Sequence, residues 1–391
     1  MARLNSPPAA SSFMSVKLLH IASFIGNVGD NASHMGLENI LSGIGLQNPV
    51  IERLEIRKFY KNYQLPDKLT FDESFAHHAN SFDGIVIGGG GFLDYWVPDS
   101  STGTTLDMEP KVLGKIKRPL IISSVGALPH QTIPEGNITR FRNFLDAALG
   151  QKNVSIALRN DGSHENIKNK FGAQYSEAMH LILDNAFFYM PSLRERLIEQ
   201  DYVAINLAPD QLGMLSYMRG TVDQDDFYRQ IQRVIEYCIG ALGLHIVLIP
   251  HIQADLKAIV RLLGSLESFT ARSMVSVAPC VQGNAGAELL FSIYRSSRFV
   301  LASRFHANVC SAAMLKPTVG IAVLDRVGFM YDSLDMENAY VLPGENLADE
   351  LIRKLSEHAR SHDSQHAPSK ALLRLKARSQ SFYEEKLASI L

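Results

Sequence analysis

The chain has 391 residues, and its 38 basic and 40 acidic side chains leave a formal charge of -2. So small a net charge excludes a general attraction for nucleic acid or for an acidic membrane surface, and any anion must be held by local groups. The length exceeds the size at which one hydrophobic core usually stops growing, which predicts two domains.

Three separate cysteines, Cys238, Cys280 and Cys310, offer neither a disulfide framework nor the spacing of a zinc site. We therefore expect a reducing, cytoplasmic location. Residues 1–15 lack the apolar stretch of a signal peptide and are predicted to form a flexible tail. No run reaches the ~20 apolar residues that a membrane span requires.

Short apolar runs begin at Val16 and alternate with segments of helical periodicity, which predicts parallel strands covered by helices on both faces. The strand candidates of the first half are VKLLHIAS, IERLEIRKF, GIVIGGGG, PLIISSVG and VSIALRND. Four of them end in Gly, Ser, Asn or Asp. These polar turns fall at the carboxyl ends of strands, where open α/β sheets bind their ligands.

The alternation restarts after a polar helix expected near 191–200. The next strand candidates are YVAINLAP, HIVLIPH, MVSVAP, RFVLAS and TVGIAVLD, with helices predicted over 224–239, 254–266, 285–296 and 306–315. The expected fold is α/β, with two Rossmann-like domains that face a central cleft. The first domain is predicted at 16–197, the second at 198–345, and a helical segment at 346–391 that packs back across the hinge.

Two glycine-containing turns are candidate ligand sites. In GNVGDNASHMG, Gly26 and Gly29 permit close backbone approaches, and Asp30, Asn31 and Ser33 are candidate helix caps. This turn is either a capped strand-to-helix turn or a site whose helix amides and Asp30 meet a sugar hydroxyl. In GIVIGGGGFLD, four glycines each cost roughly 0.5–1 kcal/mol relative to alanine, which favours a backbone that lies against a ligand over a wide turn.

Two arginines stand at predicted strand tips. Arg159 in RNDGS suits a carboxylate or phosphate, although an ion pair with Asp161 within the turn is a competing explanation, and Ser163 is expected to cap the next helix. In SRFHA, Arg304, His306 and the first-turn amides of the following helix could together hold a dianion.

Other charged groups fall on the same predicted rim. Asp325 and Arg326 follow the last long strand. His130 and His251 follow strand ends and either line the cleft or are ordinary loop histidines. No spacing typical of a catalytic metal, a nucleophile elbow or a P-loop is present.

An ordered set of motifs in the chain resembles the polysaccharide pyruvyl transferase family. In chain order these motifs are GNVGD, GGGGFLD, SSVGA, the Arg159 turn, LDNAF and SRFH followed by KPTVGIAVLDRVGF. The resemblance covers roughly residues 16–335. It implies a fold similar to that of GT-B glycosyltransferases. It also implies transfer of the enolpyruvyl unit of phosphoenolpyruvate onto sugar hydroxyls of a polysaccharide or glycan intermediate, commonly as a cyclic pyruvate ketal.

The resemblance implies a donor site in which at least two cations meet the phosphate and carboxylate of phosphoenolpyruvate. The family's Arg-x-His element falls on Arg304 and His306, and an earlier arginine and serine fall on Arg159 and Ser163. Asn160 stands where aspartate is usual, and Arg326 replaces a frequent lysine. The expected donor-binding residues are Arg159, Ser163, Ser303, Arg304, Phe305, His306, Arg326 and His251.

For catalysis, His306 is expected to serve as acid or phosphate ligand, while Asp30 or His130 assists the acceptor hydroxyl. The expected catalytic set is therefore His306, Arg304, Arg159, Asp30 and His130. The expected acceptor contacts are Asn27, Asp30, Gly89, Gly90, Gly91, Tyr95 and Trp96, with Tyr217 in a further loop. We expect no metal, no cofactor besides phosphoenolpyruvate as donor substrate, and a sugar or lipid-linked oligosaccharide as acceptor, without nucleic acid.

Two other functions fit the same pattern. A GT-B glycosyltransferase would use a nucleotide sugar and would need an acidic residue for its ribose, for which Glu288 is a candidate. A non-catalytic family relative could instead serve in a polysaccharide-synthesis complex, an alternative that the departures at Asn160 and Arg326 leave open. Asp184 and Glu288 fall on family-like positions and are expected to be structural.

Overall fold

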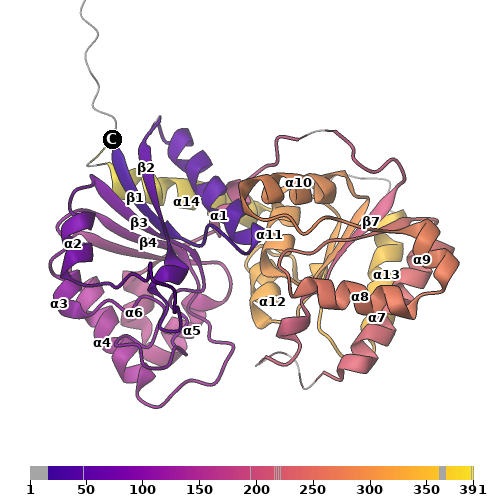
Figure 1. Cartoon of the computed structure of the whole chain (residues 1–391), viewed down its shortest axis with the longest axis horizontal. Coiled ribbons are helices and arrows are strands. Elements are labelled where there is room, and N and C mark those ends of the chain that lie inside the picture. The colour runs from indigo at the N-terminus through magenta and orange to yellow at the C-terminus, as the bar shows by residue number, and fades with distance from the viewer. Residues whose placement is uncertain are drawn as a thin grey trace, which may run out of the picture.

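The computed structural model describes residues 16–390 except 47, 194, 215, 217, 219, 221, 361–366 and 389. The tail expected at 1–15 and the acceptor contact expected at Tyr217 therefore lie outside the described residues. The chain forms two lobes side by side, each built around a six-stranded sheet (Figure 1). The two-domain α/β architecture predicted from the alternating pattern is confirmed.

The first lobe contains a sheet of order β2-β1-β3-β4-β5-β6, in which every pair is parallel. Its strands are β1 (Lys17–Ala22), β2 (Val50–Glu55), β3 (Gly84–Gly90), β4 (Leu120–Val125), β5 (Val154–Arg159) and β6 (His180–Ile182). Its helices are α1 (Val28–Gly43), η1 (Ile56–Phe59), α2 (Glu73–Ala79), α3 (Pro110–Leu113), α4 (Asn137–Leu149), α5 (Ser163–Phe171), α6 (Ala173–Ala178) and η2 (Asn185–Phe188). Strands β3 and β4 are buried along their whole length, including Ser123 and Ser124 of β4, as expected of parallel strands covered on both faces.

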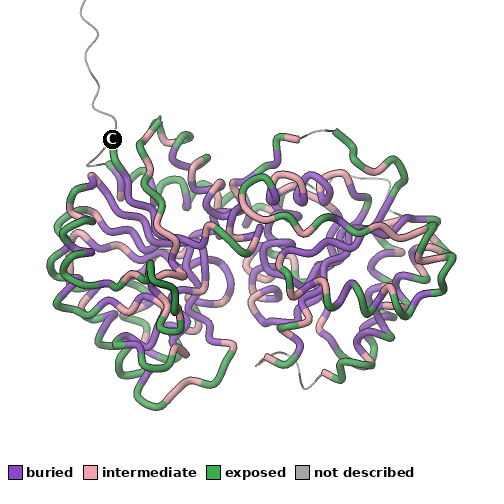
Figure 2. Tube along the Cα trace, viewed as in Figure 1, coloured by how far each residue is buried: buried purple, intermediate pink, exposed green. Residues whose placement is uncertain are grey.

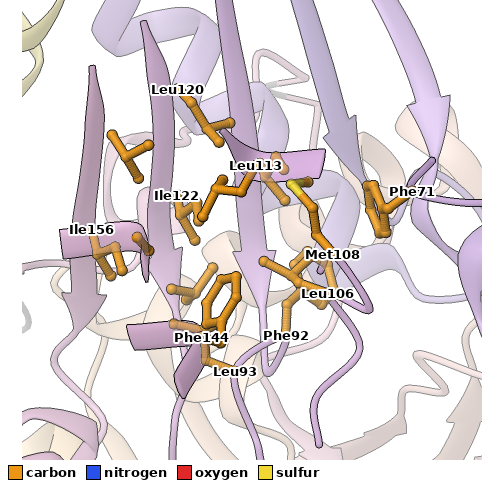
Figure 3. Close-up of a cluster of buried hydrophobic side chains, with 14 of the residues drawn as sticks. Phe71, Phe92, Leu93, Leu106, Met108, Leu113, Leu120, Ile122, Phe144 and Ile156 are labelled. Atoms are coloured by element: carbon orange, nitrogen blue, oxygen red, sulfur yellow. The ribbon is translucent and has the colours of Figure 1, made fainter. Parts of the chain in front are cut away.

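The core of the first lobe also fixes the long segment that follows β3. This segment contributes Phe92, Leu93, Leu106, Met108 and Leu113, which pack with Leu120, Ile122, Phe144 and Ile156 on one face of the sheet (Figure 3). Burying each large apolar side chain stabilises the fold by about 1.5–3 kcal/mol. The turn at 94–96, which lies between these anchors, is thereby held in one position.

The second lobe contains a parallel sheet of order β12-β11-β10-β7-β8-β9. Its strands are β7 (Tyr202–Asn206), β8 (His245–Leu248), β9 (Val275–Val277), β10 (Phe299–Ala302), β11 (Thr318–Ile321) and β12 (Tyr340–Val341). Its helices are η3 (Pro209–Gln211), α7 (Gln224–Gly240), α8 (Asp255–Ser265), α9 (Ser268–Met274), α10 (Gly283–Ser296), α11 (Phe305–Ala313), α12 (Asp325–Asp332), η4 (Glu337–Ala339) and α13 (Leu347–Arg360). None of the described helices is both long and apolar enough to cross a bilayer.

Each predicted strand run overlaps an observed strand, whereas β6 and β12 were not predicted because two or three residues show no periodicity. The polar helix expected near 191–200 is wrong: the described residues there are not helical. Glu288 of α10 instead accepts hydrogen bonds from the Leu193 amide at 2.6 Å, the Ser192 hydroxyl at 2.7 Å and the Tyr189 hydroxyl at 2.9 Å. By accepting these hydrogen bonds, the Glu288 carboxylate stabilises an extended connection in preference to a helix.

Helix α14 (Lys370–Leu387) and a shared apolar cluster are among the features that join the lobes. Helix α14 returns to the first lobe, where it lies along the sheet (Figure 1) and places the buried hydroxyl of Tyr383 2.9 Å from both Ser123 Oγ and Asn185 Oδ1. In addition, Val28 and Ala32 of α1 belong to one apolar cluster with residues of α10, α11 and α12, and Figure 2 shows buried segments on both sides of this junction. This shared core fixes the orientation of the two sheets that form the site.

Candidate functional site

Two adjoining cavities lie where the carboxyl ends of both sheets meet. The inner cavity, of about 120 Å³, is lined by residues of both lobes: Asn27, Asp30, Gly90, Gly91, Arg159, Gln211, His251, Arg304, Phe305, His306 and Arg326. The outer cavity, of about 420 Å³, shares Asp30, Gly90, Gly91 and Arg326 with it and extends along the first lobe past Trp96 and His130. The position agrees with the rule that open α/β sheets bind ligands at the carboxyl ends of their strands.

The start of α1 borders both cavities. Asn27 caps the helix and accepts a hydrogen bond from the Gly29 amide at 3.0 Å, so the cap is not one of the three residues considered from the sequence. Asp30 then lies 3.6 Å from His306 Nδ1 and 3.4 Å from a guanidinium nitrogen of Arg57. A Cβ atom on Gly29 would lie 2.6 Å from His306 Nδ1, so this glycine allows the histidine to pack on the helix.

The four-glycine run serves two purposes. Gly88 and Gly89 are explained by packing: a Cβ on Gly88 would collide with the Ser123 carbonyl, and Gly89 has a φ of +85° and approaches Ser33. Gly90 and Gly91 line both cavities. Gly89, an expected acceptor contact, therefore lies against α1 and away from both cavities, whereas the second half of the run forms part of both cavity walls.

Arg159 at the end of β5 is almost completely buried beside the inner cavity. Its Nε donates to Asp161 Oδ2 at 2.7 Å and its Nη1 to Asp184 Oδ2 at 3.2 Å, while its guanidinium lies over the Phe305 ring, 4.4 Å from the centroid. Burial opposes the charge, but Asp161 and Asp184 outweigh it and raise the pKa of Arg159. The ion pair considered as an alternative thus exists, and it positions a cation at the cavity wall.

Arg304, which precedes α11, is held in the same way by the second lobe. Its guanidinium pairs with Asp255 at the start of α8, with an Nε–Oδ2 distance of 2.9 Å, and with Asp210 at 2.7 Å. Burial disfavours the charged form, but the hydrogen bonds to Asp255 dominate and the pKa of Arg304 is raised. Guanidinium groups from both lobes therefore reach one cavity.

His306 lies between two carboxylates of the first lobe, although it belongs to the second. Its Nε2 is 3.4 Å from Asp184 Oδ2. The two atoms do not meet the geometry of a hydrogen bond, so the contact is electrostatic. Burial raises the pKa of Asp184, but His306, Arg159 and the Ala186 amide outweigh burial and lower it to about 2. The ionised Asp184 thus lies against both Arg159 and His306.

His251 forms part of the inner cavity wall and is fully buried. Its Nε2 lies 2.9 Å from the Tyr294 hydroxyl, and within the described part of the chain its Nδ1 has no hydrogen-bond partner. Burial, together with Arg304 and His306, lowers the pKa of His251 well below its usual value. An unpaired buried nitrogen at a cavity wall is available to a ligand.

Arg326, at the start of α12, reaches across to the first lobe at the boundary between the cavities. Its Nη2 lies 2.7 Å from His130 Nδ1 and 3.3 Å from Asp94 Oδ2. The Trp96 ring meets His130 edge-on, with centroids 5.9 Å apart. Three expected residues, Arg326, His130 and Trp96, therefore meet at the outer cavity.

The side chains of three expected contact residues have partners away from both cavities. Ser163 donates its hydroxyl to Asp161 and accepts the Ala127 amide at 2.7 Å, and it begins α5 without capping it. Ser303 accepts the Ala208 amide at 2.7 Å. Tyr95 stacks on Phe141 in the core of the first lobe and is only 1% exposed. None of the three lines either cavity.

Sequence reasoning missed the carboxylates that orient these cations. Asp94, Asp210 and Asp255 received no role, and Asp184 was treated as structural only. Each of these carboxylates stands shortly after a strand, at the same sheet edge as the arginines. The rule that ligands bind at the carboxyl ends of parallel strands could therefore have identified them as well. Asn160, which replaces an expected aspartate, instead donates to Ser333 Oγ at 2.9 Å and so links β5 to the second lobe.

The described residues contain no group of three or more His, Cys, Asp or Glu side chains arranged to hold a metal ion. The recognisable chemistry is that of cations and helix amides around a small volume. The first-turn amides of α11 have no partner within the helix and begin at Phe305, which lines the inner cavity. This arrangement suits a small anionic molecule.

Fold and site define a two-domain protein of GT-B-like architecture with an arginine-lined cavity between its domains. The chain belongs to the polysaccharide pyruvyl transferase family, whose model matches residues 27–325. The resemblance found in the sequence is thus confirmed. No curated protein matches the chain.

Solved structures with this architecture are known. The UDP-GlcNAc 2-epimerase of Methanocaldococcus jannaschii matches with a TM-score of 0.57 at 12% identity, over 96% of this chain and 100% of that chain. S. aureus MnaA with UDP gives 0.56 at 10% identity, over 96% and 97%. The Neisseria meningitidis UDP-GlcNAc 2-epimerase bound to UDP-GlcNAc gives 0.55 at 11% identity, over 95% and 100%. At such identities the likeness concerns the fold alone.

Proposed function

We propose that the protein transfers the pyruvyl group of phosphoenolpyruvate to two hydroxyls of a sugar acceptor and closes a cyclic ketal. The observation that carries the proposal is the inner cavity, where Arg159 from the first lobe and Arg304 and Arg326 from the second border one volume of about 120 Å³. Phosphoenolpyruvate carries a phosphate and a carboxylate, and guanidinium groups bind both through paired hydrogen bonds. The acceptor would occupy the outer cavity beside it.

The proposed chemistry assigns a proton transfer to each cavity. The methylene carbon of phosphoenolpyruvate takes a proton from His306, and a sugar oxygen bonds to the carbon that bears the phosphate as its own proton passes to a base on the acceptor side. A second hydroxyl then displaces the phosphate, and its proton leaves with the phosphate. Asp184, ionised beside His306, would stabilise the imidazolium before the transfer.

The inner cavity is unsuited to a nucleotide sugar. Sites for ligands of drug size usually enclose about 300–1,000 Å³, well above the volume between the arginines. Glu288, the candidate for a ribose contact, is occupied by the connection between the lobes. Both observations favour a small donor over the nucleotide-sugar alternative.

The carboxylates around the cavity also limit donor affinity. Asp30, Asp94, Asp161, Asp184, Asp210 and Asp255 all lie against the arginines or His306. A dianion therefore gains less binding free energy here than it would from three arginines without carboxylate partners. A proton on His306 should strengthen its binding. The expected donor is a substrate bound with moderate affinity.

Calorimetric titration tests this proposal with phosphoenolpyruvate, UDP-GlcNAc and inorganic phosphate. We expect phosphoenolpyruvate to bind and UDP-GlcNAc not to bind. Arg304→Gln should weaken phosphoenolpyruvate binding by at least tenfold, whereas Arg298→Gln, which alters a half-exposed arginine outside the inner cavity, should leave it unchanged.

Binding of UDP-GlcNAc without phosphoenolpyruvate would favour a glycosyltransferase, and binding of neither would favour a non-catalytic role. The product requires a separate test. Mass spectrometry of glycans from cells that lack the protein should show loss of a pyruvate-sized substituent. An unchanged glycan profile would contradict the proposed reaction.

A further inference from the structure

Asp94, His130 and Arg326 form a three-membered contact from both lobes at the boundary of the two cavities. Arg326 Nη2 is 2.7 Å from His130 Nδ1, and Asp94 Oδ2 is 3.4 Å from the same ring nitrogen. All three residues line the outer cavity, but only Arg326 also lines the inner one. A single nitrogen of His130 thus faces an obligate donor and an obligate acceptor.

The nearer partner determines the tautomer of His130. A guanidinium group only donates, so Nδ1 must accept from Arg326, and the proton of the neutral ring is on Nε2. In this tautomer the lone pair of Nδ1 is used and Nε2 has no lone pair in the ring plane. His130 in this arrangement cannot take a proton from an acceptor hydroxyl, although it borders the outer cavity.

Asp94 offers the opposite arrangement. Its Oδ1 accepts the Leu128 amide at 2.8 Å, which fixes the carboxylate in the core of the loop. Burial opposes its ionisation, but its polar and charged neighbours, Arg326 among them, outweigh burial and lower the pKa of Asp94. If Arg326 withdraws, the ionised Asp94 becomes the partner of Nδ1 and holds the ring proton there. The lone pair of Nε2 is then available to a hydroxyl, as in other carboxylate-oriented histidine bases.

A donor anion supplies the reason for Arg326 to withdraw. Nη2 makes its present contacts with a neutral ring nitrogen, a carbonyl at 3.3 Å and one carboxylate oxygen at 3.3 Å. Hydrogen bonds to ionised acceptors are about twice as strong as neutral ones, and a phosphate in the inner cavity presents several such oxygens. The side chain already borders that cavity.

We infer that Arg326 is a switch operated by the donor. In the empty site, Arg326 donates a hydrogen bond to His130 and blocks it. When the donor anion attracts Arg326, His130 pairs with Asp94 instead and serves as the base for the acceptor hydroxyl. The inference rests on the proposed function and adds an order to it. The acceptor oxygen loses its proton to His130 Nε2 only when phosphoenolpyruvate is present. Asp94 is a positioning residue in this scheme.

Nuclear magnetic resonance of protein labelled with [¹⁵N]histidine tests the switch, and the loss of one signal set in His130→Gln identifies the ring of interest. Without ligand, the Nδ1 resonance should be that of an unprotonated nitrogen. Saturation with phosphoenolpyruvate should exchange the protonated and unprotonated signatures of the two nitrogens. Asp94→Asn should abolish this exchange.

Arg326→Met should give the switched tautomer without any ligand, because methionine keeps an unbranched apolar stem but cannot donate a hydrogen bond. Arg140→Met, a change outside both cavities, is the matched control and should retain the wild-type tautomer. The wild-type titration does not depend on either variant being folded.

The outcomes separate the switch from the proposed function. If calorimetry shows that phosphoenolpyruvate binds and the His130 nitrogens keep their signatures, the switch is refuted and the donor assignment stands. If phosphoenolpyruvate does not bind, the proposed function fails and the switch fails with it. An unswitched His130 in folded Arg326→Met would also overturn the inference.

Discussion

Replacing Gly29 with alanine should disable the site while leaving most of the fold intact. The new Cβ would lie 2.4 Å from His306 Cβ and 2.6 Å from its Nδ1, whereas ordinary contacts begin near 3.4 Å, so His306 and the start of α11 that carries it must retreat by about 1.0 Å. A displacement near 1 Å can reduce turnover about 10²-fold, because catalytic groups act only within a narrow geometry. Moving His306 also disturbs its contacts with Asp30 and Asp184.

The same substitution has a predictable effect on stability. Alanine in a helix is usually favoured over glycine by about 0.5–1 kcal/mol, but overpacking costs about 1–3 kcal/mol. Because the collision involves the buried ring and the helix that joins the lobes, we expect Gly29→Ala to lower the free energy of unfolding by about 1–2 kcal/mol. Gly43→Ala is the matched control: it lies in the same helix α1 with no atom within 4 Å of the added Cβ.

Urea unfolding and phosphate release from phosphoenolpyruvate in the presence of acceptor glycans measure these effects together. We expect Gly43→Ala to be as active as the wild type and equally or more stable. If Gly29→Ala matches Gly43→Ala in both assays, the close packing of His306 on α1 is refuted. A loss of stability without a loss of turnover would refute the catalytic placement of His306 alone.

Two further residues give separate tests. Asp184→Asn should reduce the free energy of unfolding by about 3 kcal/mol, because Arg159 and His306 lose a buried charged partner, whereas Asp67→Asn, which changes an exposed ion pair, should leave it nearly unchanged. Folding lowers the pKa of Asp184 from 3.8 to about 2, so the stability that its carboxylate contributes is present above pH 4 and is lost as the pH falls toward 2. The urea midpoint of Asp184→Asn should therefore decline less than that of the wild type over this interval. Parallel declines of the two proteins would contradict this. Tyr383→Phe should cost about 1–3 kcal/mol and speed amide exchange of α14, while equal exchange rates would show that the helix docks without this hydroxyl.

Local patterns predicted much of this protein. Alternating apolar and helical segments identified ten strands and the two-domain α/β fold, because parallel strands buried on both faces are apolar at nearly every position. The positions of Arg159, Arg304, His306 and Arg326 at strand ends were enough to place them at one cavity, because parallel strands bring their carboxyl ends to one edge. The short strands were not predicted. The extended connection before β7 was not predicted either, because it is stabilised by Glu288, which is distant in sequence.

The sequence by itself determined which residues stand at the edge of each sheet, and this depends only on neighbours along the chain. Tertiary structure decided which of them share a cavity. Ser163, Ser303 and Tyr95 stand in comparable turns, yet buried partners occupy their side chains. The carboxylates that hold each arginine, and the approach of Arg326 to His130, come from separate elements and separate lobes. The physical reason is that ion pairs and cavities depend on distances in space, and packing of the shared core between the lobes sets those distances.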